Sequence, residues 1–396
     1  MRHIIAIFIK ELTDSIRDRR TLFTAVLMPI VLMPVVMIGS FKIQEAQVKS
    51  LEQKSAKIGI HSMESVPTLV NFLRSQEKIE IIDVAADVYG DRIEDGTINI
   101  YLDVPSTFEE NLKSEIPSEI GIVQKSSNVD SSSAVAKVTV ALQAFNAKVS
   151  VERLDERDVS AAVITVIVPK PVDISTPEER GGFFIGLLLP MFIVIFAIVG
   201  GMYIAIDVSA GEKERKTLEA LLLTPASRFE IVAGKFLAVA ATASTSIILS
   251  LFSLYAAFKF FPPNFGGESF VINLAPQAIG VMLIIGVILA IMFSGLLLSV
   301  AIFAKSYKEA QNYITPFYLL AVLPVAIFAQ LPGFKPTDLY FIIPGVNAVF
   351  VIKEVILGTY DMTHIVITII SLLVYAGISM YVAGRIYSKE SILFRS

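Results

Sequence analysis

Six stretches of the chain are apolar over the length of a membrane-spanning helix and contain no charged residue. A spanning helix needs about 20 mostly apolar residues, because it rises about 1.5 Å per residue across about 30 Å of hydrocarbon. A charge near the centre of such a helix opposes insertion. The pattern therefore predicts an α-helical polytopic membrane protein with six transmembrane helices. The uncharged windows are residues 22–41, 181–206, 236–258, 278–304, 310–334 and 365–384.

A seventh uncharged stretch, residues 339–352, is too short to span a bilayer. It contains Pro344 and Gly345 and is followed by Lys353 and Glu354. We expect the segment 339–357 to form a re-entrant or interfacial helix in the outer half of the membrane. An amphipathic helix on the protein surface is the alternative interpretation.

An amphipathic helix is predicted before the first span, over residues 1–21. Apolar side chains recur there at helical intervals, and charged side chains occupy the opposite face. Such a helix is expected to lie in the membrane interface on the cytoplasmic side, and packing against a cytosolic partner is the alternative. The apolar face comprises Ile5, Phe8, Ile9, Leu12 and Ile16, and the charged face comprises Lys10, Glu11, Asp14, Arg17 and Asp18.

The region between the first two windows, residues 42–180, has a different pattern. Short runs rich in β-branched residues alternate with stretches of helical periodicity, which predicts a small sheet with helices on its faces. We therefore expect a mixed α/β domain between transmembrane helices 1 and 2. The predicted strands cover residues 57–61, 79–84, 98–104 and 120–123, and the predicted helices cover residues 68–75, 108–114 and 131–156.

Composition and charge support this division. Hydrophobic residues make up 54% of the 396 residues and charged residues only 18%, against about 25% charged residues in a soluble chain. The net charge of −4 is unevenly distributed: residues 42–182 hold 15 basic and 23 acidic residues, and the remainder holds 18 and 14. These values exclude a cytosolic globular enzyme.

Metal and cofactor chemistry has little support in the sequence. The chain has no cysteine, which excludes disulfides, iron–sulfur clusters and thiolate zinc sites. Its three histidines, His3, His61 and His364, are too few for a histidine-based metal centre to be expected. We therefore assign no catalytic residue, cofactor, metal site or nucleic-acid partner to this chain.

The orientation in the membrane follows from the basic residues of the short loops, which favour the cytoplasmic side. With the N-terminus inside, the cytoplasmic segments carry 15 Lys and Arg residues and the short outer loops carry 3. We expect a multi-pass plasma-membrane protein with both termini in the cytoplasm and residues 42–180 outside it.

The cytoplasmic loop 207–235, between the second and third spans, carries the most specific signal. Two capping boxes, Ser209 with Glu212 and Ser227 with Glu230, predict a short charged helix and the start of the third span. The charges and the apolar edge of the short helix could dock on a partner, and a solvated loop is the alternative. The apolar edge is formed by Leu218, Leu221 and Leu222.

The sequence GEKERKTLEALLLTP at residues 211–225, followed by Glu230, Gly234 and Lys235 in the pattern ExxxGK, closely resembles the cytoplasmic loop of ABC transporter permeases of the type 2 (export) superfamily. The resemblance extends over the whole chain and is strongest to sodium-efflux permease subunits of the NatAB type. Members of that group often have glycine where this chain has Lys216.

The resemblance implies that two copies of the chain pair as a homodimer and that two copies of a separate ABC ATPase dock beneath them. ATP and magnesium would bind to that ATPase, and this chain would be the permease subunit of a sodium exporter. The chain itself has no P-loop, since Gly234 and Lys235 are followed by Phe236. The residues expected to couple to the ATPase are Glu212, Glu214, Arg215, Thr217, Leu218, Glu219, Leu221, Leu222, Thr224 and Pro225.

Three other functions are alternatives. An exporter of a drug, a peptide or a lipid would share the same loop. A membrane receptor or signalling protein that senses through the outer domain would need a cytoplasmic output domain, and only a short tail follows Arg385. An intramembrane protease is disfavoured, because no Ser/His pair, metal motif or paired aspartate lies in the spans.

Hydroxyl side chains follow one face of the predicted third span, at Thr242, Ser246, Ser250 and Ser253. Their oxygens could line a pathway for a hard cation such as sodium. Small polar residues also let helices approach closely and hydrogen-bond to each other. Packing is therefore the alternative to a pathway.

Overall fold

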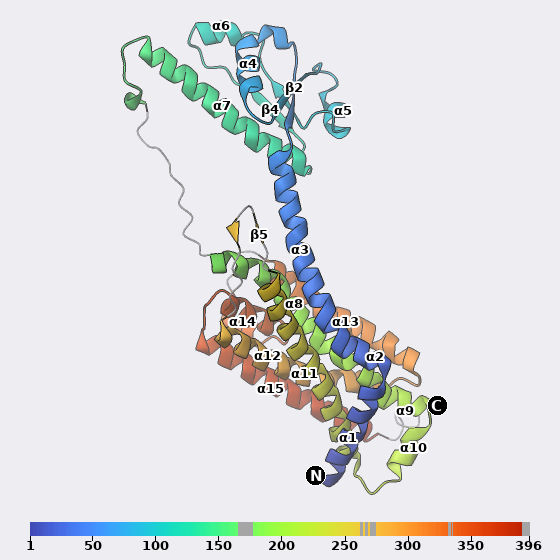
Figure 1. The fold of residues 1–396 in the computed structure, drawn as a ribbon. Coiled ribbons are helices and arrows are strands. Elements are labelled where there is room, and N and C mark those ends of the chain that lie inside the picture. The colour runs from blue at the N-terminus through green and yellow to red at the C-terminus, as the bar shows by residue number, and fades with distance from the viewer. Residues whose placement is uncertain are drawn as a thin grey trace. The chain divides into compact units, whose positions relative to one another are not determined.

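The computed structural model describes residues 1–164, 177–261, 264–265, 268–269, 275–331, 334 and 336–389 (Figure 1). The chain divides into two compact units. Unit 1 comprises Met1–Ile43 and Ile174–Ser396, and unit 2 comprises Gln44–Asp173. The first of the two boundaries, after Ile43, lies within helix α3 (Met28–Gln53).

Unit 1 is a helical bundle, and six helices of the described chain are long and apolar enough to cross a membrane. This confirms the predicted number of spans. The six are Arg19–Leu51, Ile185–Glu214, Arg228–Phe260, Pro276–Ala301, Tyr307–Gln330 and Met362–Tyr387. The elements of the unit are α1 (Arg2–Arg17), α2 (Arg19–Leu22), a π-helical segment (Phe23–Leu27), the first part of α3, α8 (Pro177–Ile206), a second π-helical segment (Asp207–Gly211), α9 (Glu212–Glu214), α10 (Thr217–Leu222), α11 (Arg228–Phe260), the short strands β5 (Asn264–Phe265) and β6 (Glu268–Ser269), α12 (Pro276–Ala301), α13 (Tyr307–Gln330), a 3₁₀ turn (Asp338–Phe341), α14 (Val346–Ile356) and α15 (Met362–Tyr387).

Three predicted boundaries are wrong. Helix α12 ends at Ala301, before residue 304, because Ser306 caps the start of α13 and the chain has to turn before it. Helix α13 ends at Gln330, before residue 334, since Leu331 precedes a proline in the sequence and takes an extended conformation, which the residue before a proline favours. Helix α3 continues past residue 42 to Gln53, because residues 42–53 are mostly good helix formers such as Lys, Gln, Glu and Leu.

The segment predicted to be re-entrant contains α14, which is buried on all sides within unit 1. Residues 346–352 are consecutively buried, and α14 contacts α8, α12, α13 and α15. Helix α14 approaches α8 closely at Gly182, where a Cβ would lie only 3.1 Å from the carbonyl oxygen of Ile356. An amphipathic helix on the surface is therefore excluded. The position of α14 in the outer half of a bilayer stays a prediction.

Unit 2 contains a small mixed sheet of four strands in the order β2-β1-β3-β4. Strand β1 pairs in parallel with β2 and β3, and β3 pairs antiparallel with β4. Buried side chains such as Ile58, Ile100 and Leu69 form its core with the helices. The elements are β1 (Ala56–Ile60), a 3₁₀ turn (Met63–Ser65), α4 (Pro67–Ser75), β2 (Ile79–Asp83), α5 (Tyr89–Glu94), β3 (Ile100–Asp103), α6 (Phe108–Lys113), β4 (Gly121–Gln124), α7 (Val129–Asp155) and a 3₁₀ turn (Ala161–Val163).

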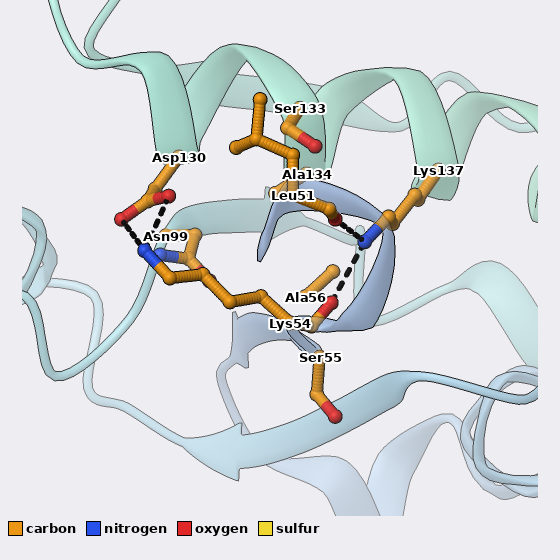
Figure 2. Close-up of a pocket in the computed structure, with 9 residues that line it drawn as sticks. All are labelled: Leu51, Lys54, Ser55, Ala56, Asn99, Asp130, Ser133, Ala134 and Lys137. Atoms are coloured by element: carbon orange, nitrogen blue, oxygen red, sulfur yellow. Dashed lines mark hydrogen bonds and ion pairs between the residues drawn. The ribbon is translucent and has the colours of Figure 1, made fainter. Parts of the chain in front are cut away.

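The end of α3 is joined to α7 within unit 2, as Figure 2 shows. The Lys137 ammonium on α7 donates hydrogen bonds to the carbonyls of Leu51 and Lys54, each at 2.7 Å. These carbonyls lie at the C-terminal end of α3, where a helix has no partners for them. The Lys54 Nζ lies 2.9 Å from both carboxylate oxygens of Asp130 in the first turn of α7. Both contacts hold the end of α3 against α7.

Candidate functional site

The motif of the cytoplasmic loop, residues 211–225, begins as an extension of the second span, not as a separate helix. Helix α8 continues through the π-helical segment into α9, and the chain breaks at Lys216, which has a left-handed φ of 57°. The predicted capping box at Ser209 and Glu212 is wrong. Ser209 lies inside the π-helical segment, and its hydroxyl donates to the Ala205 carbonyl one turn earlier. The second box, Ser227 with Glu230, is confirmed at the start of α11.

A group of four charged side chains, three of them buried and Lys10 about half exposed, joins α1, α9 and α11, and we call it the ion network. It consists of Lys10, Glu11, Glu212 and Lys235. Lys235 is fully buried, and its three N–H groups donate to Glu212, to the Val208 carbonyl and, at 3.3 Å, to Glu11. The Lys10 Nζ lies 3.1 Å from Glu11 and 3.0 Å from Glu212. Two ammonium groups balance two carboxylates, which is the condition under which buried charges are tolerated.

The electrostatics of the ion network keep Lys10 charged. Burial acts to lower the pKa of Lys10, but the carboxylates of Glu11 and Glu212 outweigh it and raise the pKa above its ordinary value of 10.5. The stability that Lys10 contributes is therefore present at pH values below 10.5 and is lost only at higher pH. Lys10 is therefore charged at physiological pH.

Helix α1 approaches α11 closely at Gly234. A Cβ at that position would lie 2.8 Å from the Cβ of Ile7, so glycine is needed for the contact. The same contact buries Glu11, which the sequence pattern had placed on an outward charged face. Glu11 is drawn inward because Lys235 supplies a cation on α11. The side chains of the predicted apolar stripe instead remain largely exposed, with Ile5 and Ile9 each 55% exposed.

The three residues of α9 each contact a different part of the bundle. Glu212 belongs to the ion network and so connects to α1 and α11. Lys213 donates to the carbonyls of Ile302 and Ala304, which follow the end of α12. Glu214 accepts the backbone N–H of Tyr307 at 2.8 Å, at the start of α13. A cation at a helix C-terminus and a carboxylate at an N-terminus both satisfy free backbone groups.

The residues predicted to couple to an ATPase divide into buried and exposed sets. Leu218 is buried, and Leu221 and Leu222 are partly buried against the core of unit 1. The prediction that these three form an apolar edge open to a partner is therefore wrong for Leu218. Arg215 forms an ion pair with Asp207 at 2.7 Å, and Thr217 lies 3.4 Å from the Glu212 carbonyl. The exposed positions of α10 and the following turn are Thr217, Glu219, Ala220, Leu223, Thr224 and Pro225.

Sequence reasoning missed Leu223, Lys10 and Lys235 as members of the site. Leu223 is 88% exposed and is the apolar side chain of this turn that a partner could contact. An exposed leucine between Leu222 and Thr224 could have been suspected from helical periodicity, because it falls off the buried face. The pairing of Lys10 and Lys235 with Glu212 leaves no local signal in the sequence.

The hydroxyl stripe on α11 is hydrogen-bonded to backbone carbonyls. Ser246 donates to the Ala25 carbonyl at 2.7 Å. Pro29 lies four residues after Ala25 and has no N–H to offer that carbonyl. Ser246 replaces this missing donor. Thr242 and Ser250 donate within α11, and Ser253 lies 3.3 Å from the Pro29 carbonyl. These contacts are what helix packing requires.

Comparison with known proteins gives two matches. The sequence model of the family described as "ABC-2 family transporter protein" matches residues 19–383, a segment that reaches into both units and all six candidate spans. The chain is also 29% identical over 387 residues to the "ABC transporter permease protein NatB" of Bacillus subtilis (strain 168). That match covers 97% of this chain and 97% of the relative.

Proposed function

Because this chain belongs to the ABC-2 transporter family, we propose that it acts as the permease subunit of an exporter driven by a separate ATPase. Membership makes it a multi-pass membrane protein and an ABC-2 transporter permease related to NatB. The proposal adds that two copies pair and that each contacts an ATPase which binds ATP and magnesium. It also places both termini in the cytoplasm and residues 42–180 outside.

The observation that carries the proposal is the set of contacts made by α9. This short helix ends the second span and is fixed to α11, α12 and α13 through Glu212, Lys213 and Glu214. The adjoining α10 leaves Glu219 and Leu223 exposed at the end of the bundle where the N-terminus lies (Figure 1). A displacement of α10 by the ATPase would therefore be transmitted to several spans at once, because packed helices move as units.

Coupling can be tested by changing the exposed face of α10. Glu219→Lys with Leu223→Asp should leave the fold intact, since neither side chain is buried. The variant should lose transport driven by the ATPase in vesicles that contain both proteins. Its binding to the ATPase should weaken by about tenfold or more, as for loss of an anchor residue of an interface.

A matched control makes the same two changes in unit 2, at Glu110→Lys and Val140→Asp, both exposed positions. The control should transport and bind the ATPase like the wild type. Unchanged transport in the α10 variant, or an equal loss in both variants, would remove α10 as the coupling element.

Sodium is the proposed substrate, and this assignment rests on the resemblance to sodium-efflux permeases. Export of a drug, a peptide or a lipid is the alternative within the same family. The two are separated by loading vesicles that contain permease and ATPase with radioactive sodium. ATP-dependent efflux supports sodium, and efflux that does not depend on ATP argues against it.

The α11 hydroxyls could still line the pathway, and Ser246 offers the sharpest test. Ser246→Ala leaves the Ala25 carbonyl without this donor, which should cost about 1–3 kcal/mol of stability if packing is its role. Thr245→Ala removes a neighbouring exposed hydroxyl as the control. A variant that keeps its melting temperature but loses sodium efflux would favour a pathway.

A further inference from the structure

A cavity of about 710 Å³ opens at the same end of unit 1 as α9. It lies between the start of the first-span helix and the start of α13, and both of these pack against α8. Tyr203 of α8, Phe23 and Tyr307 contribute to its walls. Its volume falls within the range of about 300–1,000 Å³ typical of ligand-binding sites.

The lining of the cavity is rich in basic side chains. Arg19, Arg20 and Lys308 all line it and are exposed. Within the described residues, none of the three lies within ion-pair distance of a carboxylate. Such unpaired cations favour an anionic ligand.

Two carboxylates near the cavity are already engaged. Glu214 lines it and accepts the backbone N–H of Tyr307. Asp18 lies close enough to Arg20 for the charges to interact, and its oxygens accept the backbone N–H groups of Arg20 and Thr21. A third nearby carboxylate, Asp207, forms an ion pair with Arg215. Three cations thus line a site whose lining contains one carboxylate, Glu214.

Tyrosines and an apolar strip complete the site. The rings of Tyr203 and Tyr307 lie 6.4 Å apart, and neither hydroxyl makes a hydrogen bond within the part of the chain that is described. Phe23, Leu27 and Val31 are 53%, 51% and 49% exposed and follow one another at intervals of four residues. They form an apolar strip that begins in the cavity and continues along the first-span helix.

We propose that this cavity binds the phosphate-bearing headgroup of an anionic phospholipid, with an acyl chain against Phe23, Leu27 and Val31. A basic pocket between spans at the cytoplasmic side is suited to such headgroups. A free phosphate or an acidic protein surface would use the cations but would leave the apolar strip without a partner. The cytoplasmic location rests on the proposed orientation.

The test uses the purified permease without its ATPase, in detergent, with dioleoyl phosphatidylglycerol and dioleoyl phosphatidylcholine as probes. Native mass spectrometry and thermal shifts report binding. Arg19→Gln, Arg20→Gln and Lys308→Gln together should weaken phosphatidylglycerol binding on the order of a hundredfold. Binding of phosphatidylcholine should not change.

The control removes the same charge from exposed positions at the same end, through Arg2→Gln, Arg17→Gln and Lys389→Gln. It should bind phosphatidylglycerol like the wild type. If the triple variant misfolds, Lys308→Gln alone replaces it, with an expected weakening of about fivefold.

Three results would overturn the proposal. The first is equal phosphatidylglycerol binding in the wild type and the cavity variant. The second is equal protection by glycerol 3-phosphate at the same concentration, which would indicate a site for a free phosphate. The third, from a separate binding assay with the ATPase, is a cavity variant that loses ATPase binding while its phosphatidylglycerol binding is unchanged, which would indicate a protein contact. Since the lipid assay contains no ATPase, its failure would leave the coupling proposal standing.

Discussion

The two units hold their charged side chains in different surroundings. In unit 1, Lys235 is 0% exposed and is paired with Glu11 and Glu212, which are each 3% exposed. In unit 2, the side chains of the Lys54–Asp130 pair are 55% and 39% exposed. The ion-pair distances are similarly short in both units, but only the buried side chains of unit 1 have lost their hydration.

The difference teaches that burial, not distance, decides what these pairs contribute. An exposed pair exchanges contacts with water for contacts with its partner and contributes about 0–1 kcal/mol. Buried charges have lost their hydration, so removing one partner leaves the other uncompensated at a cost of about 3–5 kcal/mol. The ion network should therefore specify how α1, α9 and α11 assemble, and the Lys54 pair should not.

The largest effect is expected from Lys235→Met, which leaves two buried carboxylates with one remaining cation. We expect a loss of about 3–5 kcal/mol, measured as thermal unfolding of the purified protein. Lys389→Met, an exposed lysine at the same end, should change stability little. Adding Glu212→Gln to Lys235→Met should recover part of the loss, and no recovery would contradict the network.

A smaller effect is expected from Lys137→Met in unit 2. Its two charge-assisted hydrogen bonds to the end of α3 are partly exposed, so their loss should cost about 1–2 kcal/mol. Hydrogen exchange should accelerate around residues 50–56 while the rest of the sheet stays protected. Lys113→Met, exposed on α6, is the control, and equal exchange in both variants would argue against the role of Lys137.

A stabilising change of about 1 kcal/mol is expected from Lys216→Gly. The left-handed φ of 57° at Lys216 is strained for a residue with a Cβ, by about 1–2 kcal/mol, and is free for glycine. Ala220→Gly, an exposed position inside α10, should instead destabilise by about 0.5–1 kcal/mol. A lower melting temperature for Lys216→Gly would show that its side chain makes a needed contact.

The smallest effect is expected from Lys54→Met. A double-mutant cycle with Asp130→Asn should give a coupling energy of about 0.2–1 kcal/mol that decreases with added salt. A coupling energy as large as the loss of stability expected for Lys235→Met would mean that exposure does not explain the difference between the ion pairs of the two units.

The features that the sequence predicted well are local. Apolar runs, short β-rich runs and the Ser227–Glu230 capping box depend on residues within a few turns of one another, and the structure contains all of them. The Ser209 box was mispredicted because the preceding span continues through it as a helix, which a local motif does not exclude. The length of α3 was missed because the predicted span was ended at residue 41, before the charged Lys42.

By itself, the sequence determined the family, the six apolar helices and the sheet-containing segment between the first two of these helices. Length, apolarity and motif spacing are properties of a continuous stretch of chain, so they can be read without the fold. Only the tertiary structure decided the partners of Lys235, which are 23 and 224 residues away along the chain. It also decided that Leu218 is buried and Leu223 is exposed. The physical reason is that the energy of a charge or an apolar side chain depends on what surrounds it, and packing of distant helices sets those surroundings.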